Sequence, residues 1–232
     1  MLLFSLLVVI KDKEINKNVE FNLYKIGGRT MKKIICVIFS ILLVLGSIGF
    51  AFADTGVISP TRIGEKVELN VPLYQQQKSY TCGPACIRMA LKKFGYSVSE
   101  STIESLAGTT SSSGTYVYKV AQTLNHYLGN KYAYYTTSGT NFGEKLLTSL
   151  RAGYPVICHV KPTALPNYNN QHVPSGHYVI VKGFILQTGA TTQISIQYND
   201  PNWNDATYGS YTTTIPVMEQ AIDANAGYYI SH

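Results

Sequence analysis

The spacing of apolar residues changes at Pro155, and this change limits the folds that the chain can adopt. Before Pro155 apolar residues recur every three or four positions, which is typical of amphipathic helices. This spacing predicts four helices, at 82–94, 99–106, 114–128 and 141–152. After Pro155 the apolar segments are short and rich in Val and Ile, which predicts strands at 155–160, 177–186 and 193–198.

Shorter segments complete the predicted domain. Alternating residues and apolar runs predict three strands and one helix, at 67–71, 131–137, 228–230 and 217–224 respectively. Helices therefore come first along the chain and most of the strands come later. This order predicts an α+β domain in which N-terminal helices pack on an antiparallel sheet.

A basic and then apolar segment precedes this domain. Met31-Lys32-Lys33 is followed by the apolar run 34–50 and by Ala51-Phe52-Ala53. This pattern is typical of a bacterial secretory signal peptide. We expect residues 31–53 to be cleaved off before Asp54, which predicts a secreted protein without membrane contact thereafter. The alternative is a retained anchor, for which the apolar run is at the lower limit of a bilayer-spanning length.

Residues 1–30 do not resemble part of a folded domain. Their apolar start, 1–10, is cut off by Lys11-Asp12-Lys13-Glu14 and is too short to cross a membrane. We expect a start codon assigned too early, with Met31 as the true initiator and 1–30 as an upstream extension. The alternative takes Ile26-Gly27-Gly28 as the end of a double-glycine leader.

Export would leave an extended N-terminal arm at 54–70 and a single domain at 71–232. Of the 19 basic and 13 acidic residues, seven basic and three acidic ones precede Asp54, so the formal net charge falls from +6 to +2. The remaining positive residues are scattered apart from Lys92-Lys93, which does not indicate a nucleic-acid partner. We expect the domain to be a monomer.

Three cysteines follow the predicted cleavage site: Cys82, Cys86 and Cys158. An odd number in an exported protein predicts at least one free thiol and no disulfide scaffold. Cys86 and Cys158 occupy apolar positions and are predicted to pack in the core. Cys82, Cys86 and a histidine have a spacing that suits zinc, but no second cysteine pair follows. We therefore expect no metal and no other cofactor.

Cys82 differs from the other two cysteines because it lies at the predicted start of a helix. A cysteine attacks as a thiolate, a form that helix N-termini and a neighbouring imidazolium favour. Gly83 has no side chain and is predicted to leave room for an approaching substrate carbonyl. Cys82 is therefore the candidate nucleophile, and it requires a base that a third group holds in place.

Four histidines are candidates for that base: His126, His159, His172 and His177. His177 opens the most apolar strand, and Asp200 ends the next predicted strand. If these two strands pair as a hairpin, the start of one lies beside the end of the other, and the two side chains become neighbours. The long separation between His177 and Asp200 predicts a roomy hairpin loop near 187–192.

Four parts of the sequence occur in a characteristic order: Gln76, Cys82-Gly83-Pro84-Ala85, His177-Tyr178-Val179 and Asp200-Pro201. In this order they resemble the bacteriocin-processing type of cysteine peptidase, family thirty-nine of the papain-like clan, and its free-standing relatives. The resemblance runs from about Val71 to the C-terminus. It implies a papain-like cysteine peptidase fold.

The resemblance also implies a role for each of four residues. Cys82 would attack the substrate carbonyl, and His177 would take the thiol proton and later protonate the leaving amine. Asp200 would orient the imidazole. Gln76 would donate its side-chain amide to the oxyanion beside the backbone N–H of Cys82, a contact typically worth ~3 kcal/mol. The transporter-linked members cleave after Gly-Gly, and we do not extend that substrate to a chain expected to be exported alone.

Together these features predict an exported cysteine peptidase that hydrolyses peptide bonds through a Cys-His-Asp triad and a thioester. Its partner would be a peptide or protein substrate, cell-wall peptides included. One alternative is a cell-wall amidase, transpeptidase or deamidase on the same scaffold, for which His159 leaves a Cys-His-His arrangement open. Another is a non-catalytic peptide-binding domain, which would have no need of the thiol of Cys82. Trp203 is predicted to be either a lid over the site or a loop anchor.

Overall fold

The computed structural model describes residues 62–168, 176–189 and 191–232. The predicted upstream extension, the signal peptide and the first part of the arm lie outside these residues, as does His172. Among the helices of the described segments, none is long and apolar enough to cross a membrane.

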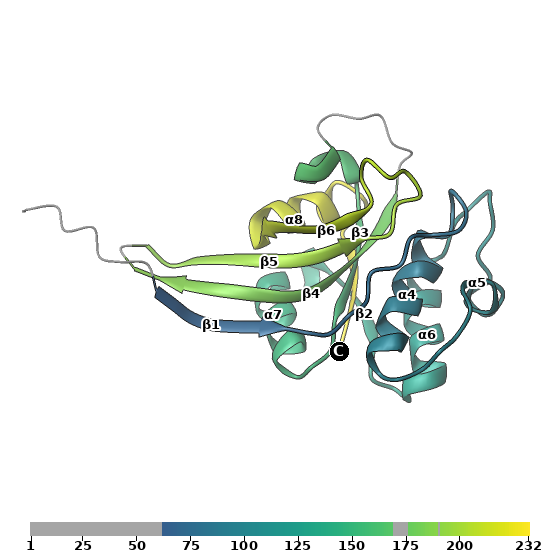
Figure 1. The fold of residues 1–232 in the computed structure, drawn as a ribbon, viewed down its shortest axis with the longest axis horizontal. Helices are drawn as coiled ribbons and strands as arrows, with labels where there is room; N and C mark the ends of the chain where they lie inside the picture. The colour runs from purple at the N-terminus through teal and green to yellow at the C-terminus, as the bar shows by residue number, and fades with distance from the viewer. Residues whose placement is uncertain (1–61, 169–175, 190) are drawn as a thin grey trace, which may run out of the picture. The chain divides into compact units, whose positions relative to one another are not determined.

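Five α-helices and seven strands make up the described domain (Figure 1). The helices are α4 (Cys82–Lys93), α5 (Glu100–Ala107), α6 (Val117–Leu128), α7 (Phe142–Arg151) and α8 (Ile215–Asp223). The strands are β1 (Arg62–Glu68), β2 (Ala133–Thr136), β3 (Val156–Val160), β4 (His177–Thr188), β5 (Gln193–Asp200), β6 (Gly209–Thr214) and β7 (Tyr228–Ser231).

All seven strands belong to one antiparallel sheet. Its order is β2-β7-β3-β4-β5-β6, and β1 adds to it by pairing with β4. β3 pairs with the first residues of the long strand β4, from His177 to Val181, whereas β1 pairs with the last ones, from Gly183 to Thr188. β4 therefore pairs with three strands, β1, β3 and β5. Its first residue, His177, lies at the same end of the sheet as the last residue of β5, Asp200.

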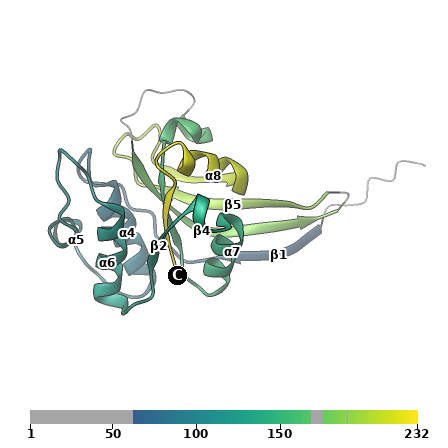
Figure 2. The same ribbon diagram turned by 180° about the vertical axis from the view of Figure 1, so that it is seen from behind.

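Side chains of the central strands alternate between two hydrophobic cores. Cys158, Val179 and Val181 pack with residues of α7 and α8 on one face of the sheet. Ile157 and Ile180 pack with residues of α4, α5 and α6 on the other face. Because both faces are covered, β3 and the first half of β4 are mostly apolar. The predicted α+β architecture is confirmed, and Figures 1 and 2 show α4–α6 grouped apart from α7 and α8.

The strand predicted at 67–71 lies earlier in the chain, since β1 ends at Glu68. Beyond it, the N–H of Leu69 donates to the carbonyl of Lys182 at 2.8 Å, and the N–H of Val71 donates back to Leu69 at 2.8 Å. This tight turn takes the chain out of the sheet. Pro72 follows, and its nitrogen has no hydrogen with which to continue a ladder.

Two further predictions differ from the structure. The helix predicted at 114–128 begins only at Val117, because Gly114 has a φ of 63° and closes a small bridge with Thr110. The strand β6 was not predicted, because its sequence of Gly, Ser, Tyr and Thr residues carries little apolar signal. β6 lies at the edge of the sheet, where a polar strand is tolerated.

The hairpin loop predicted near 187–192 lies between β4 and β5, but it is shorter than predicted. β4 and β5 extend further than predicted and pair as far as Gln187 with Gln193. The residues between His177 and Asp200 are therefore taken up by two long strands instead of by a wide loop.

Gly83 also has a packing role that was not predicted. A Cβ built on Gly83 would lie 2.6 Å from Oγ1 and 2.8 Å from Cβ of Thr115. The Thr115 side chain is itself held by a 2.7 Å hydrogen bond between its hydroxyl and that of Thr109. The missing side chain therefore lets α4 pack closely against the segment that leads into α6.

We expect Gly83→Ala to lower the free energy of unfolding by about 1–3 kcal/mol, because the new methyl group displaces the Thr115 segment. Thr115→Gly removes the clashing atoms, so the alanine should cost less in that background. A double-mutant cycle by urea denaturation measures the coupling. Equal costs of Gly83→Ala in the two backgrounds would contradict this packing role.

Candidate active site

Cys82 is the first residue of α4, at the point where the chain leaves an irregular segment. It is half-buried, whereas Cys86, one turn further on, is fully buried and donates its thiol to the carbonyl of Tyr178. Pro84 lies within the first helical turn, where its missing N–H costs no hydrogen bond. The thiol of Cys82 is therefore presented at a helix N-terminus, as predicted, and Cys86 and Cys158 pack in the core.

His177 and Asp200 meet at one end of the sheet. β4 begins at His177 and the antiparallel strand β5 ends at Asp200, so the two residues emerge side by side. The Nε2 atom of His177 lies 2.7 Å from Oδ1 of Asp200, with both side chains buried. The predicted hairpin neighbours are thus in direct contact.

The thiol of Cys82 also interacts with the imidazole of His177 and helps to raise its pKa. Because Nε2 faces Asp200, Nδ1 is the ring nitrogen left for the thiol. Burial alone would lower the pKa of His177, but the attraction and hydrogen bond of Asp200, with a smaller contribution from Cys82, raise the pKa above its ordinary value. Burial raises the pKa of the Cys86 and Cys158 thiols, which keeps both of them protonated.

Asp200 is held by three further donors besides His177. Its Oδ1 accepts the backbone N–H of Asn202 at 3.0 Å, and its Oδ2 accepts the hydroxyl of Tyr168 at 2.9 Å and the amide of Asn167 at 3.0 Å. All four partners donate, which suits an ionised carboxylate. Asp200 thus caps the turn that follows it through Asn202 and contacts His177 at the same time.

The sequence did not predict the contacts that Asn167, Tyr168 and Asn202 make with Asp200. Asn202 follows Asp200 by two residues, and such a spacing is common for a carboxylate that accepts a backbone N–H in a turn. Tyr168 and Asn167 belong to a short 3₁₀ segment far away in the sequence, and no local pattern connects them to Asp200.

Gln76 lies next to the same site and is nearly fully buried. Its backbone N–H donates to the carbonyl of Pro201 at 2.7 Å, which ties it to the residue after Asp200. Its side-chain Nε2 donates to the carbonyl of Lys78 at 2.7 Å. An amide nitrogen carries two hydrogens, so one N–H of Gln76 has no assigned partner among the described residues.

A buried carboxylate fastens the segment between Gln76 and Cys82. Oε1 of Glu100, on α5, accepts the backbone N–H of Gln77 at 2.8 Å and the hydroxyl of Thr81 at 2.6 Å. Glu104, one turn further on, forms an ion pair with Lys78 at 2.8 Å. These contacts fix the segment that carries both candidate residues. Glu100 was not predicted, because its partners are a backbone group and a hydroxyl.

The candidate site opens into one pocket of about 500 Å³. Gln76, Cys82 and His177 share it with the 111–115 loop and with Trp203. The indole of Trp203 is 61% exposed, while its carbonyl accepts a hydrogen bond from Gln75 at 3.1 Å. Trp203 is therefore anchored by its backbone and leaves its side chain at the rim of the pocket.

His159 also lines this pocket, but it does not take the third place of the site. Its ring stacks on that of Tyr178 with centroids 4.5 Å apart. Burial, with repulsion from His177, lowers the pKa of His159 to about 4, so the ring is neutral at pH 7. The Nε2 atom of His177 pairs with Asp200 instead, so the arrangement is Cys-His-Asp and not Cys-His-His.

The remaining predicted candidates lie elsewhere. His126 is on the exposed face of α6. Within the described segments, no group of three or more His, Cys, Asp and Glu side chains is arranged to hold a metal ion. The thiol of Cys86 is occupied by its bond to Tyr178 and faces the core, which leaves Cys82 without a second sulfur ligand.

Helices packed on an antiparallel sheet, with a cysteine at a helix start facing a histidine–aspartate pair, define a cysteine peptidase-like domain of papain-like fold. The chain belongs to the Peptidase_C39 like family, whose model matches residues 68–227. The expected family and fold are therefore confirmed.

Solved structures also resemble this chain. A C39-like peptidase from Bacillus anthracis is 23% identical, with 72% of this chain and 98% of that chain covered and a TM-score of 0.53. A double glycine motif protease from an AMS/PCAT transporter, solved with its leader peptide, is 16% identical, with coverage of 74% and 96% and a TM-score of 0.46. The peptidase domain of Streptococcus ComA, a bi-functional ABC transporter of a quorum-sensing pathway, is 18% identical, with coverage of 69% and 96% and a TM-score of 0.45. No curated protein gave a significant match.

Proposed function

We propose that this chain is an exported cysteine peptidase that hydrolyses peptide bonds through Cys82, His177 and Asp200. The observation that carries the proposal is the position of His177, whose ring contacts the thiol of Cys82 on one side and the carboxylate of Asp200 on the other. This is the arrangement that a nucleophile, its base and an orienting group require.

The chemistry follows from this geometry. The Cys82 sulfur attacks the carbonyl carbon of the substrate, and its proton is held by His177, which passes it to the leaving amine as the C–N bond breaks. The thioester that remains is attacked by water, whose proton returns through His177 to the sulfur as the C–S bond breaks. The products are an amine and a carboxylic acid, and the thiol is restored.

Two N–H groups are available for the oxyanion in each step. The backbone N–H of Cys82 is at the first position of α4, where helical N–H groups have no partner within the helix. Gln76, whose side-chain amide retains one N–H without an assigned partner among the described residues, lines the same pocket. Donors held in place before the reaction stabilise the developing charge without reorganisation, and losing one typically costs ~3 kcal/mol.

Selective alkylation tests the reactive pair. A free thiol with a pKa of about 8.5 is only ~0.3% ionised at about pH 6. The raised pKa of His177 keeps its ring charged at that pH, and an imidazolium favours a neighbouring thiolate. We expect iodoacetamide to label Cys82 at least about tenfold faster than free cysteine at pH 6, and this advantage should disappear in His177→Ala. Peptide mapping by mass spectrometry measures the label.

The buried thiols of Cys86 and Cys158 are internal controls in the same experiment, since burial raises the pKa of both. They should label only in denaturant. Labelling of Cys82 no faster than that of free cysteine would count against its role as nucleophile.

A digest tests the reaction itself. The purified protein and its Cys82→Ala variant are incubated with a protein-derived peptide library and with purified cell-wall peptides, and new termini are read by mass spectrometry. Cleavage by the wild type alone supports the proposal and identifies the substrate class. Binding without cleavage of either material would favour a peptide-binding domain.

Export is the second part of the proposal, and it is supported by the signal-peptide pattern at 31–53. We expect the protein recovered from the culture medium to begin at Asp54. Amino-terminal sequencing measures this directly, and a secreted product that starts before residue 54 would rule out cleavage at that position.

A further inference from the structure

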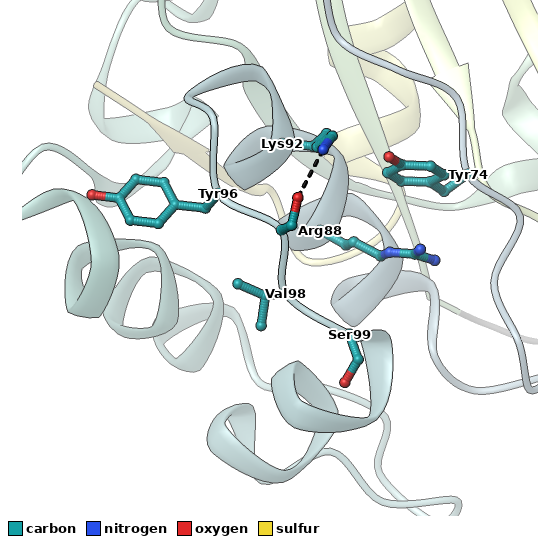
Figure 3. Close-up of a pocket in the computed structure, with 7 residues that line it drawn as sticks. Tyr74, Arg88, Lys92, Tyr96, Val98 and Ser99 are labelled. Carbon is teal, nitrogen blue, oxygen red and sulfur yellow. Dashed lines mark hydrogen bonds between the residues drawn. The ribbon is translucent and has the colours of Figure 1, made fainter.

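A second pocket, of about 280 Å³, lies beside α4 beyond the turn that carries Cys82. Arg88 and Lys92 line it from α4. The guanidinium of Arg88 extends toward the ring of Tyr74, the ammonium of Lys92 points to Ser97, and the ring of Tyr96 points away from both (Figure 3). Arg88 and Lys92 are four residues apart, which places them one helical turn from each other on the same face. The two cations therefore border one open depression of the surface.

Neither cation has a counter-charge among the described residues. Within the described part of the chain, Arg88 and Lys92 form no ion pair. The nearby acids of α5 are engaged elsewhere, since Glu100 bonds Gln77 and Thr81 while Glu104 pairs with Lys78. The pocket thus carries two positive charges without a described counter-charge.

Both side chains are held in place before any ligand arrives. The guanidinium of Arg88 stacks on the ring of Tyr74, 4.1 Å from its centroid. Stacking uses the face of the guanidinium and leaves its N–H edge free to donate to two oxygens at once. The ammonium of Lys92 donates to the hydroxyl of Ser97 at 2.7 Å and retains two N–H groups. Groups ordered in advance lose less entropy on binding.

The pocket is connected to the candidate active site along the chain. Tyr74 borders the basic pocket, and Gln76, two residues later, borders the pocket of Cys82. Along the helix axis, Arg88 and Lys92 lie about 9 and 15 Å beyond Cys82. An extended peptide advances about 3.3 Å per residue, so this distance corresponds to about three to five residues.

We propose that this pocket binds the carboxylate of an acidic side chain in the peptide substrate, about three to five residues from the bond that is cleaved. This inference rests on the proposed peptidase function. The N–H edge of Arg88 takes the two carboxylate oxygens, and Lys92 adds a second charge-assisted hydrogen bond. The pocket thereby selects substrates by a position distant from the reacting bond.

Binding without turnover tests the inference. Titration calorimetry at low salt compares acetyl-triglutamate amide with acetyl-triglutamine amide as probes, using protein that carries Cys82→Ala to prevent cleavage. We expect the acidic peptide to bind more tightly. Arg88→Gln and Lys92→Gln should each weaken it by about fivefold or more, because each removes one charge-assisted contact. Lys145→Gln, on α7, removes the same charge outside the pocket and should leave binding unchanged.

Equal binding of the two peptides, or an equal loss in Lys145→Gln, would overturn the inference. Tighter binding of inorganic phosphate than of the acidic peptide would also overturn it, in favour of a phosphate-bearing partner. If the Arg88→Gln variant does not fold, the binding measured with the Lys92→Gln variant tests the inference alone, because the Lys92 side chain is exposed. Because no turnover is needed, a failure of the peptidase proposal appears separately, as an absence of cleavage in the digest.

Discussion

Cys82→Ala should abolish peptide hydrolysis, lowering kcat by about a millionfold, the size of effect typical of removing a nucleophile from a triad. The variant loses the atom that forms the thioester, and His177 then has no thiol to deprotonate. Because Cys82 is only half-buried and alanine is smaller, the fold should remain intact. Initial rates on the peptide identified in the digest measure the effect, and circular dichroism measures the fold.

Cys86→Ala is the matched control on the same helix. It removes an identical thiol from the core, so we expect a loss of stability of about 1 kcal/mol with activity retained. Substantial hydrolysis by Cys82→Ala, or a comparable loss of activity in Cys86→Ala, would show that the nucleophile has been misassigned.

Asp200→Asn should lower kcat by about ten-thousandfold, as is typical when the orienting carboxylate of a triad becomes an amide. It should also lower the free energy of unfolding by about 3 kcal/mol. Four donors point at the Asp200 carboxylate, so an amide NH₂ in its place faces donors instead of providing acceptors. Asp205→Asn is the control, because Asp205 is exposed and accepts only from Gln75 among the described residues.

The same variant should reverse the pKa shift of His177. Asp200 raises this pKa against the effect of burial, so without its charge the pKa should fall below its ordinary value of 6.5. In the wild type, a raised folded-state pKa adds stability that is complete below pH 6.5 and lost as the pH rises through the raised pKa. The stability difference between the two proteins should therefore be larger at about pH 6 than at about pH 9. Proton NMR of the His177 ring and urea denaturation at both values measure this, and a pKa that stays raised in Asp200→Asn would contradict the assigned cause.

The apolar spacing before and after Pro155 predicted the helices and the central strands because those elements are buried on one or both faces. β6 was missed because an edge strand needs no apolar pattern. The pairing of His177 with Asp200 was predictable from chain order, since antiparallel neighbours bring the start of one strand to the end of the next. The lengths of the two strands were not predictable, because their last residues, 187–188 and 199–200, are polar and are held by cross-strand pairing.

The residues that hold the site in place were harder to predict from the sequence. Tyr168 and Glu100 each act on a partner far away along the chain, and a tyrosine or glutamate carries no local signal of such a contact. Gly83 was assigned to substrate access because it adjoins Cys82. Only the position of Thr115 reveals that Gly83 is also required for the packing of α4 against the segment before α6.

The hydrogen bond between the backbone of Gln76 and the carbonyl of Pro201 joins the segment before α4 to the end of β5. Cys82 and Asp200, which these two segments carry, are far apart in the sequence. Helices form locally and quickly, whereas such non-local pairings form late. During refolding, the return of enzymatic activity should therefore follow the slow closure of the sheet and lag behind the recovery of helical circular dichroism.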